Sequence, residues 1–155
     1  MNLEENYMKN NCFIALLSEK FYIDYPKDKY PELLTKENRP YLVCVVLVKG
    51  MRFGIPFRTN VKHKYCYYFE NSDKITESKT ALDFTKAVLL AKDEYIGRRA
   101  VIDQKEANEL IDNIDFIMKK FERFLDKYNF IVSNPNINVK NGENIKKMTT
   151  LKYFL

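Results

Sequence analysis

The only histidine of this chain lies in a short segment, residues 55–64, that is rich in side chains able to bind phosphate and transfer protons. The segment reads IPFRTNVKHK and combines an imidazole with three cations, a hydroxyl and an amide. Arginine and lysine bind phosphate oxygens, and histidine transfers protons near neutral pH. We expect six catalytic residues, five in this segment and one in the loop before the preceding strand: Arg58, Thr59, Asn60, Lys62, His63 and Arg39.

These residue types suit a reaction that needs no metal, in which the 2′-hydroxyl of RNA attacks the adjacent phosphate. Lys62 or His63 would remove the hydroxyl proton, and His63 is also favoured for protonating the leaving 5′-oxygen. Arg58 and Arg39 would hold the non-bridging oxygens, which gain negative charge in the transition state. Two further residues would align the reacting groups: Thr59 and Asn60.

A basic and aromatic surface is expected beside this segment, because residues 49–69 contain no Asp or Glu and end in a run of aromatic residues. Cations can bind the backbone of a single-stranded nucleic acid, while aromatic rings contact its unstacked bases. The residues expected to contact RNA are Lys36, Tyr41, Arg52, Lys64, Tyr65 and Lys86. The simpler interpretation is that the basic residues form a solvated strand edge and that the tyrosines face the core. In that case His63 is a structural histidine, and the arginines form surface ion pairs.

Composition limits the possible classes of protein. The 155 residues correspond to one domain, and a net charge of +5 with a pI near 9.0 favours an anionic partner. The four glycines form no phosphate-binding loop, and a single histidine without clustered cysteines argues against zinc. A two-metal nuclease needs more converging acids, and no serine nucleophile elbow is present. We therefore expect no metal or other cofactor.

The cysteines and the absence of long apolar segments indicate a cytoplasmic protein. Cys12, Cys44 and Cys66 lie in apolar or aromatic surroundings without a metal-ligand spacing, so we expect them to be reduced and buried. Residues 1–11 are polar and do not resemble a signal peptide, and the apolar run 41–48 is too short to cross a bilayer. We expect no membrane association.

The hydrophobic pattern predicts several short strands followed by one long helix. Apolar residues recur at three- and four-residue steps after Asp103, which with Glu106 forms a capping signal, and predict a helix over 103–128. Lys49 and Gly50 predict a hairpin turn. Strands are expected at 12–17, 41–48, 51–57, 65–70, 84–91 and 99–102. The expected fold is α+β: a bent antiparallel sheet or small barrel covered by helices.

Several segments, taken in order, resemble a known family. They are residues 39–41, 55–60 with 63–64, 82–88 and 151–154. Together they resemble the toxins of type III toxin–antitoxin systems, the ToxN/AbiQ superfamily, and within it the TenpN or CptN branch. The resemblance covers the chain from about residue 13 to its end.

This resemblance implies a metal-independent endoribonuclease toxin with a fold similar to the MazF/Kid/PemK barrel. Such enzymes leave 2′,3′-cyclic phosphate and 5′-hydroxyl ends on cellular or phage RNA, and several act in abortive infection. They process a small repeat RNA antitoxin, a pseudoknot that also inhibits them, and form closed protein–RNA oligomers with it.

The family's active-site loop, Thr-Ser-Pro-Lys, can be aligned in two registers. With one inserted residue Thr59 and Lys62 match, while Asn60 replaces the serine and Val61 the proline. Without the insertion Arg58 takes the threonine position.

Two other family residues have no counterpart of the same type. The lysine before the central strand is replaced by Pro40 or Arg39, so Arg39 is the expected cationic substitute. The upstream tyrosine falls near Thr35 or Lys36, with Tyr30 farther away. The resemblance therefore gives more weight in this branch to two residues: Arg58 and His63.

Two non-enzymatic functions also fit the sequence. A binding module for RNA or DNA could use the same basic, aromatic loop without catalysis. A small interaction protein could instead pair a sheet edge with a protein partner, and would not retain RNA even at low salt.

Overall fold

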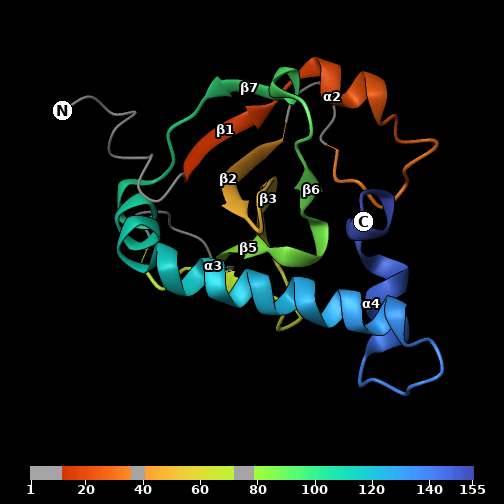
Figure 1. Ribbon diagram of the computed structural model, residues 1–155. Coiled ribbons are helices and arrows are strands. Elements are labelled where there is room, and N and C mark those ends of the chain that lie inside the picture. The colour runs from red at the N-terminus through yellow and green to blue at the C-terminus, as the bar shows by residue number, and fades with distance from the viewer. Residues whose placement is uncertain (1–11, 36–40, 72–78) are drawn as a thin grey trace.

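The computed structural model describes residues 12–35, 41–71 and 79–155. Within these ranges seven strands form one antiparallel sheet, accompanied by three α-helices and short 3₁₀ helices (Figure 1). The strand order is β4-β5-β3-β2-β1-β7, with β6 also paired to β3. The strands are β1 Phe13–Leu17, β2 Leu42–Val48, β3 Met51–Thr59, β4 Cys66–Tyr68, β5 Thr80–Asp83, β6 Val88–Leu89 and β7 Ile96–Arg99.

The predicted α+β class and antiparallel sheet are confirmed, but the sheet is not a closed barrel. Strands β4 and β7 are its two ends, and no pairing joins them among the described residues. β2 and β3 form the longest ladder, from Val43 opposite Pro56 to Val48 opposite Met51. The Lys49–Gly50 turn that joins them has positive φ at both residues, 54° and 75°, as expected for a two-residue hairpin.

The long helix, α3 Gln104–Ser133, lies across the sheet (Figure 1). The Asp103 side chain accepts hydrogen bonds from the backbone N–H groups of Lys105 and Glu106, which confirms the predicted cap. The helix continues about one turn beyond the predicted end, because Ile131 continues the buried stripe of its core face. At the centre of that face Phe121 is fully buried and packs edge-on against Phe53 of β3.

Two predicted strands are wrong in position. The segment 84–91 is divided into a 3₁₀ helix, η2 Phe84–Lys86, and the short strand β6, while the preceding β5 carries the main ladder. The cause is Asp83, whose side chain accepts the backbone N–H of Thr85 and turns the chain out of the sheet. The strand expected at 99–102 is β7, three residues earlier. Gly97 lies within it, where a Cβ would come 2.7 Å from the carbonyl oxygen of Leu16.

The C-terminal part of the chain packs beside the turn formed by η2. Helix α4 Gly142–Met148 and the 3₁₀ helix η4 Thr150–Tyr153 follow the loop after α3 (Figure 1). The Thr149 hydroxyl donates a 2.8 Å hydrogen bond to the carbonyl oxygen of Thr85, and the Thr150 hydroxyl donates to the carbonyl of Ala87. These contacts fix the η2 turn from outside the sheet.

Smaller elements complete the described structure. Ser18 caps α2 Glu19–Asp24, and η3 Asp93–Tyr95 precedes β7. The three cysteines are free and buried, in agreement with the sequence. No helix among the described residues has the length and apolar character needed to span a membrane.

Replacing Phe121 with alanine should lower the free energy of unfolding by about 3–5 kcal/mol, because it leaves a cavity between α3 and the sheet. Urea denaturation followed by circular dichroism measures this change. The matched control is Phe130→Ala on the same helix, where the side chain is 48% exposed and the expected change is within about 0.5 kcal/mol. Equal losses in the two variants would contradict this assignment of the core face.

Candidate functional site

Two strand ends bring a cation and a carboxylate together. Arg58, near the end of β3, lies opposite Ala81 of β5, and Asp83 ends β5 two residues later. The guanidinium Nη1 of Arg58 donates a 2.6 Å hydrogen bond to Oδ2 of Asp83. The Asp83 side chain is fully buried, whereas that of Arg58 is 32% exposed. Arg58 therefore joins a buried anion to the protein surface.

The histidine binds the other oxygen of the same carboxylate. Nε2 of His63 lies 3.2 Å from Oδ1 of Asp83, and its Nδ1 accepts the backbone N–H of Tyr65 at 3.1 Å. Since Nδ1 is an acceptor, the proton of the neutral ring is on Nε2 and is donated to Asp83. The carboxylate therefore fixes both the tautomer and the orientation of the imidazole.

Thr85 completes the coordination of the carboxylate. Its hydroxyl donates to Oδ1 of Asp83 at 2.6 Å, and its backbone N–H donates to the same atom at 3.0 Å. Burial raises the pKa of the Asp83 carboxyl, but the hydrogen bonds from His63, Thr85 and Arg58 outweigh burial and hold the pKa below its usual value. Asp83 is therefore an anion at neutral pH despite being buried.

Tyr41, the residue directly before the neighbouring strand β2, reaches the same cluster. The β2–β3 register continues from Val43 opposite Pro56, so Tyr41 and Arg58 lie at the same end of this ladder. Burial raises the pKa of the Tyr41 phenol, and the charge and a hydrogen bond of Arg58 act in the opposite direction. The cluster of Tyr41, Arg58, His63, Asp83 and Thr85 is called the Asp83 cluster below.

A pocket of about 410 Å³ adjoins the Asp83 cluster at His63. Its lining comes from the loop after β3 and from the region of α4: His63, Lys64, Tyr65, Lys140, Asn141, Asn144, Ile145 and Met148. The Tyr65 hydroxyl accepts hydrogen bonds from Lys127 Nζ at 3.2 Å and Asn141 Nδ2 at 3.1 Å. This basic pocket therefore has a fixed wall next to the imidazole.

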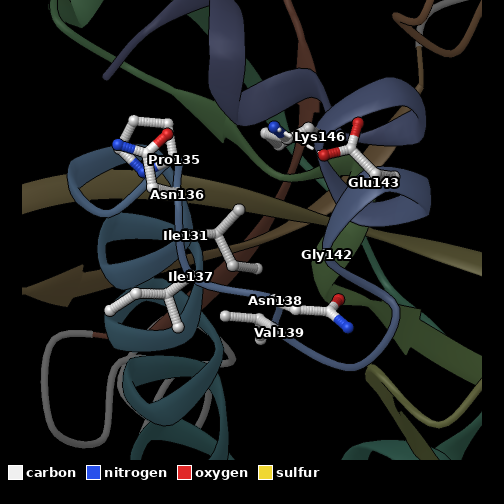
Figure 2. Close-up of a pocket in the computed structure, with 9 residues that line it drawn as sticks. All are labelled: Ile131, Pro135, Asn136, Ile137, Asn138, Val139, Gly142, Glu143 and Lys146. Carbon is white, nitrogen blue, oxygen red and sulfur yellow. Dashed lines mark ion pairs between the residues drawn. The ribbon is translucent and has the colours of Figure 1, made fainter.

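A second pocket, of about 250 Å³, lies on another face of α4 (Figure 2). Gly142, Glu143 and Lys146 line it from the helix, together with residues of the loop after α3. Figure 2 shows Glu143 and Lys146 side by side at its rim, where they form a 2.9 Å ion pair. Because the lysine is neutralised there, this pocket is less suited to an anion than the basic pocket.

Four predicted site residues lie close to one another along the chain without entering the Asp83 cluster. Thr59, Asn60, Lys62 and Lys64 are all exposed. Asn60 has a φ of 62°, a left-handed conformation that asparagine adopts readily in turns. Of this group, Lys64 lines the basic pocket, and the roles of the others remain predictions.

Two predicted RNA-contacting residues lie elsewhere or have internal partners. Arg52 is at the other end of β3, roughly 20 Å from Arg58 at the rise of an extended strand, and forms an ion pair with Asp93. The Lys86 ammonium donates to Glu32 Oε2 at 2.8 Å and to the carbonyl oxygen of Met148 at 2.7 Å. These contacts hold η2 against the end of α4 and against the segment that contains Glu32. Two further predicted residues lie outside the described ranges: Lys36 and Arg39.

Sequence reasoning missed the residue at the centre of the cluster, Asp83. A carboxylate directly after the apolar pair Ala81 and Leu82, followed by Phe-Thr, was an available signal of a buried acid that starts a turn. It also missed Lys127, Lys140, Asn141 and Asn144. Nothing in the local sequence connects these four residues to the histidine loop, because only the packing of α3 and α4 brings them there.

No protein-family model, curated protein or solved structure matches this chain. Among the described residues, no group of three or more His, Cys, Asp and Glu side chains is arranged to hold a metal ion.

Replacing Asp83 with asparagine should lower the free energy of unfolding at pH 7 by about 1.5–3 kcal/mol, because charged hydrogen bonds in a buried position are lost. The pKa of Asp83 is depressed in the folded state. Its ionised form therefore stabilises the fold above the unfolded pKa of about 3.9, and this contribution is lost as the pH falls through the folded pKa.

Urea denaturation at several pH values between 2 and 7 tests this prediction. The difference between the wild type and Asp83→Asn should shrink as the pH falls below about 4. The control is Asp126→Asn, since the Asp126 side chain is 59% exposed in its ion pair with Lys49. A difference between wild type and Asp83→Asn that does not change with pH would disprove the ionised state of Asp83.

Proposed function

We propose that this protein is a metal-independent endoribonuclease that cleaves single-stranded RNA by attack of the 2′-hydroxyl on the adjacent phosphate. The observation that supports it most is the convergence of Arg58 and His63 on the buried Asp83, beside a basic pocket. The chain's charge of +5 also suits an RNA ligand.

In this reaction Asp83 positions His63 and does not touch the substrate. The carboxylate holds the Nε2 proton, so Nδ1 is the nitrogen that can accept a proton. To do so it exchanges the Tyr65 N–H for the 2′-hydroxyl of the substrate. The 2′-oxygen then bonds to phosphorus as the 5′-oxygen leaves, and this yields a 2′,3′-cyclic phosphate and a 5′-hydroxyl.

Arg58 is suited to hold the phosphate during this step. A guanidinium has five N–H donors, and the 2.6 Å bond to Asp83 uses Nη1 of a side chain that is 32% exposed. Donors that face solvent can bind the non-bridging oxygens as their negative charge grows. Lys62, exposed and next to His63 along the chain, would supply a second cation and the proton for the leaving 5′-oxygen. The sequence alone favoured His63 for that proton, but in this proposal His63 is the base.

The wider biological role in this proposal is that of a cytoplasmic type III toxin, based on the ordered resemblance to the ToxN/AbiQ superfamily. A fold of the MazF/Kid/PemK type, a pseudoknot repeat RNA antitoxin and a closed protein–RNA oligomer belong to the same proposal. Tandem short repeats directly upstream of the reading frame would support it.

A second candidate function, RNA binding without cleavage, is favoured by one specific observation. Both ring nitrogens of His63 already have protein partners, Tyr65 N–H and Asp83 Oδ1, as they would in a purely structural histidine. Binding affinity does not separate the two functions, because both depend on salt in the same way.

Incubation of the purified protein with single-stranded RNA in EDTA should yield fragments with cyclic phosphate ends. Replacing the 2′-hydroxyl at the cleaved position by hydrogen should abolish that cleavage, because the nucleophile is missing. Gel electrophoresis and mass spectrometry of the ends provide the measurement. Bound but intact RNA would favour the binding module over the nuclease.

Single variants should then separate the proposed roles. His63→Ala should lower the cleavage rate by about 10²–10⁴-fold, the usual contribution of a general acid or base. Arg58→Ala should lose about 10²–10³-fold, as for removal of one donor to a developing anion. The control is Lys92→Ala, a cation 54% exposed near Asp24 and away from the cluster. If Arg58→Ala cleaved RNA at the wild-type rate, Arg58 would not bind the phosphate in this mechanism.

A further inference from the structure

The basic pocket has the volume and charge of a site for a small anion. At about 410 Å³ it falls in the size range of small-molecule sites. The eight described residues that line it include Lys64 and Lys140 and no carboxylate. Both lysines are exposed, so their ammonium groups can reach a ligand. A phosphate group is the natural partner of two such cations.

Tyr65 shows that the pocket is electropositive before any ligand binds. Its hydroxyl accepts two hydrogen bonds, from Lys127 on α3 and from Asn141. Burial raises the pKa of the Tyr65 phenol, but these two bonds and the charges of Lys127 and Lys64 outweigh burial and lower it. The ring also packs against Phe124, with centroids 5.5 Å apart, so the hydroxyl has a fixed position. With two donors directed at its oxygen, the hydroxyl can direct its own proton toward an acceptor on a ligand.

The rest of the lining suits a nucleotide better than an inorganic anion. Asn144 lines the pocket from α4, and Asn141 lines it from the N-cap position directly before that helix. A side-chain amide both donates and accepts hydrogen bonds, as base edges and ribose hydroxyls require. Ile145 and Met148 add an apolar surface that a base or sugar can cover. Phosphate alone would use only the lysines.

The position of the pocket relates it to the cleavage site. His63 lines the pocket and also binds Asp83, so a ligand in the pocket lies next to the imidazole. We propose that the pocket binds one nucleotide of single-stranded RNA, the one flanking the cleaved phosphodiester. Lys64 and Lys140 hold its phosphate, and Asn141 and Asn144 bind its base or ribose. This inference rests on the proposed function and extends it to a defined substrate subsite.

Titration of the wild-type protein with the four ribonucleoside 3′-monophosphates tests the proposal, with isothermal calorimetry as the readout. We expect binding of at least one of them at low salt. Lys140→Ala and Asn144→Ala should each weaken it about tenfold, the size of a lost hydrogen bond to a charged or buried group. Both side chains are exposed, so these variants should fold, and thermal melting verifies this. The control is Lys146→Ala, on the face of α4 that lines the other pocket.

The possible results test the nucleotide pocket and the nuclease activity independently of each other. Absence of nucleotide binding by a protein that cleaves RNA would overturn the pocket proposal and leave the nuclease intact. Nucleotide binding that depends on Lys140 and Asn144, in a protein that cleaves no RNA, would support the pocket and contradict the nuclease. Equal affinity for inorganic phosphate, or equal binding by Asn144→Ala and wild type, would overturn the assignment of a nucleotide.

Discussion

A single buried negative charge organises this molecule around its candidate site. A carboxylate removed from water is costly unless opposite charges and hydrogen-bond donors surround it. Asp83 is fully buried and meets this requirement with Arg58 from β3, His63 from the following loop, and Thr85 from its own turn. The end of β3, the histidine loop and the turn after β5 are therefore held together by contacts with one carboxylate.

The same charge gives the site its chemical character. It offsets the charge of Arg58 on the inner side, while the solvent-facing side retains Lys64, Lys140 and the Tyr65 hydroxyl with its two donors. An anion arriving from solvent therefore meets two groups that protein contacts already orient, the Arg58 guanidinium and the Tyr65 hydroxyl. Preorganisation of this kind is what makes electrostatic stabilisation effective in active sites.

The parts of the structure predicted from the sequence are those specified by local patterns. The periodicity after Asp103 gave α3, and Lys49 with Gly50 gave the hairpin of β2 and β3. The sheet was predicted as antiparallel, but whether it closes depends on β4 and β7, two strands far apart in sequence. Residues 84–91 have the composition of a strand. They do not form one continuous strand, because the Asp83 side chain accepts the backbone N–H of Thr85 in place of a partner strand and starts a turn.

In the candidate site, too, local features could be predicted from the sequence and contacts between distant segments could not. The histidine loop was identified because its unusual residue types are adjacent in sequence. The carboxylate that orients the histidine lies twenty residues later (position 83 against 63), and the amides of the pocket lie at the start of α4, near the end of the chain. Residues this far from the histidine in sequence approach it only when the chain packs, so no local sequence pattern predicts them. Arg39 and Lys36, which the sequence places near the site, lie outside the described residues.

The hydrogen bonds from Thr149 and Thr150 to the η2 turn have a consequence for the order in which the molecule assembles during translation. Thr149, which binds the carbonyl oxygen of Thr85, follows it by 64 residues. At about 5–20 residues per second, a ribosome needs roughly 3–13 s to cover that interval. The sheet strands through β6 are therefore synthesised seconds before the segment that braces the turn after Asp83, and a nascent chain passes through a stage in which this turn is unsupported.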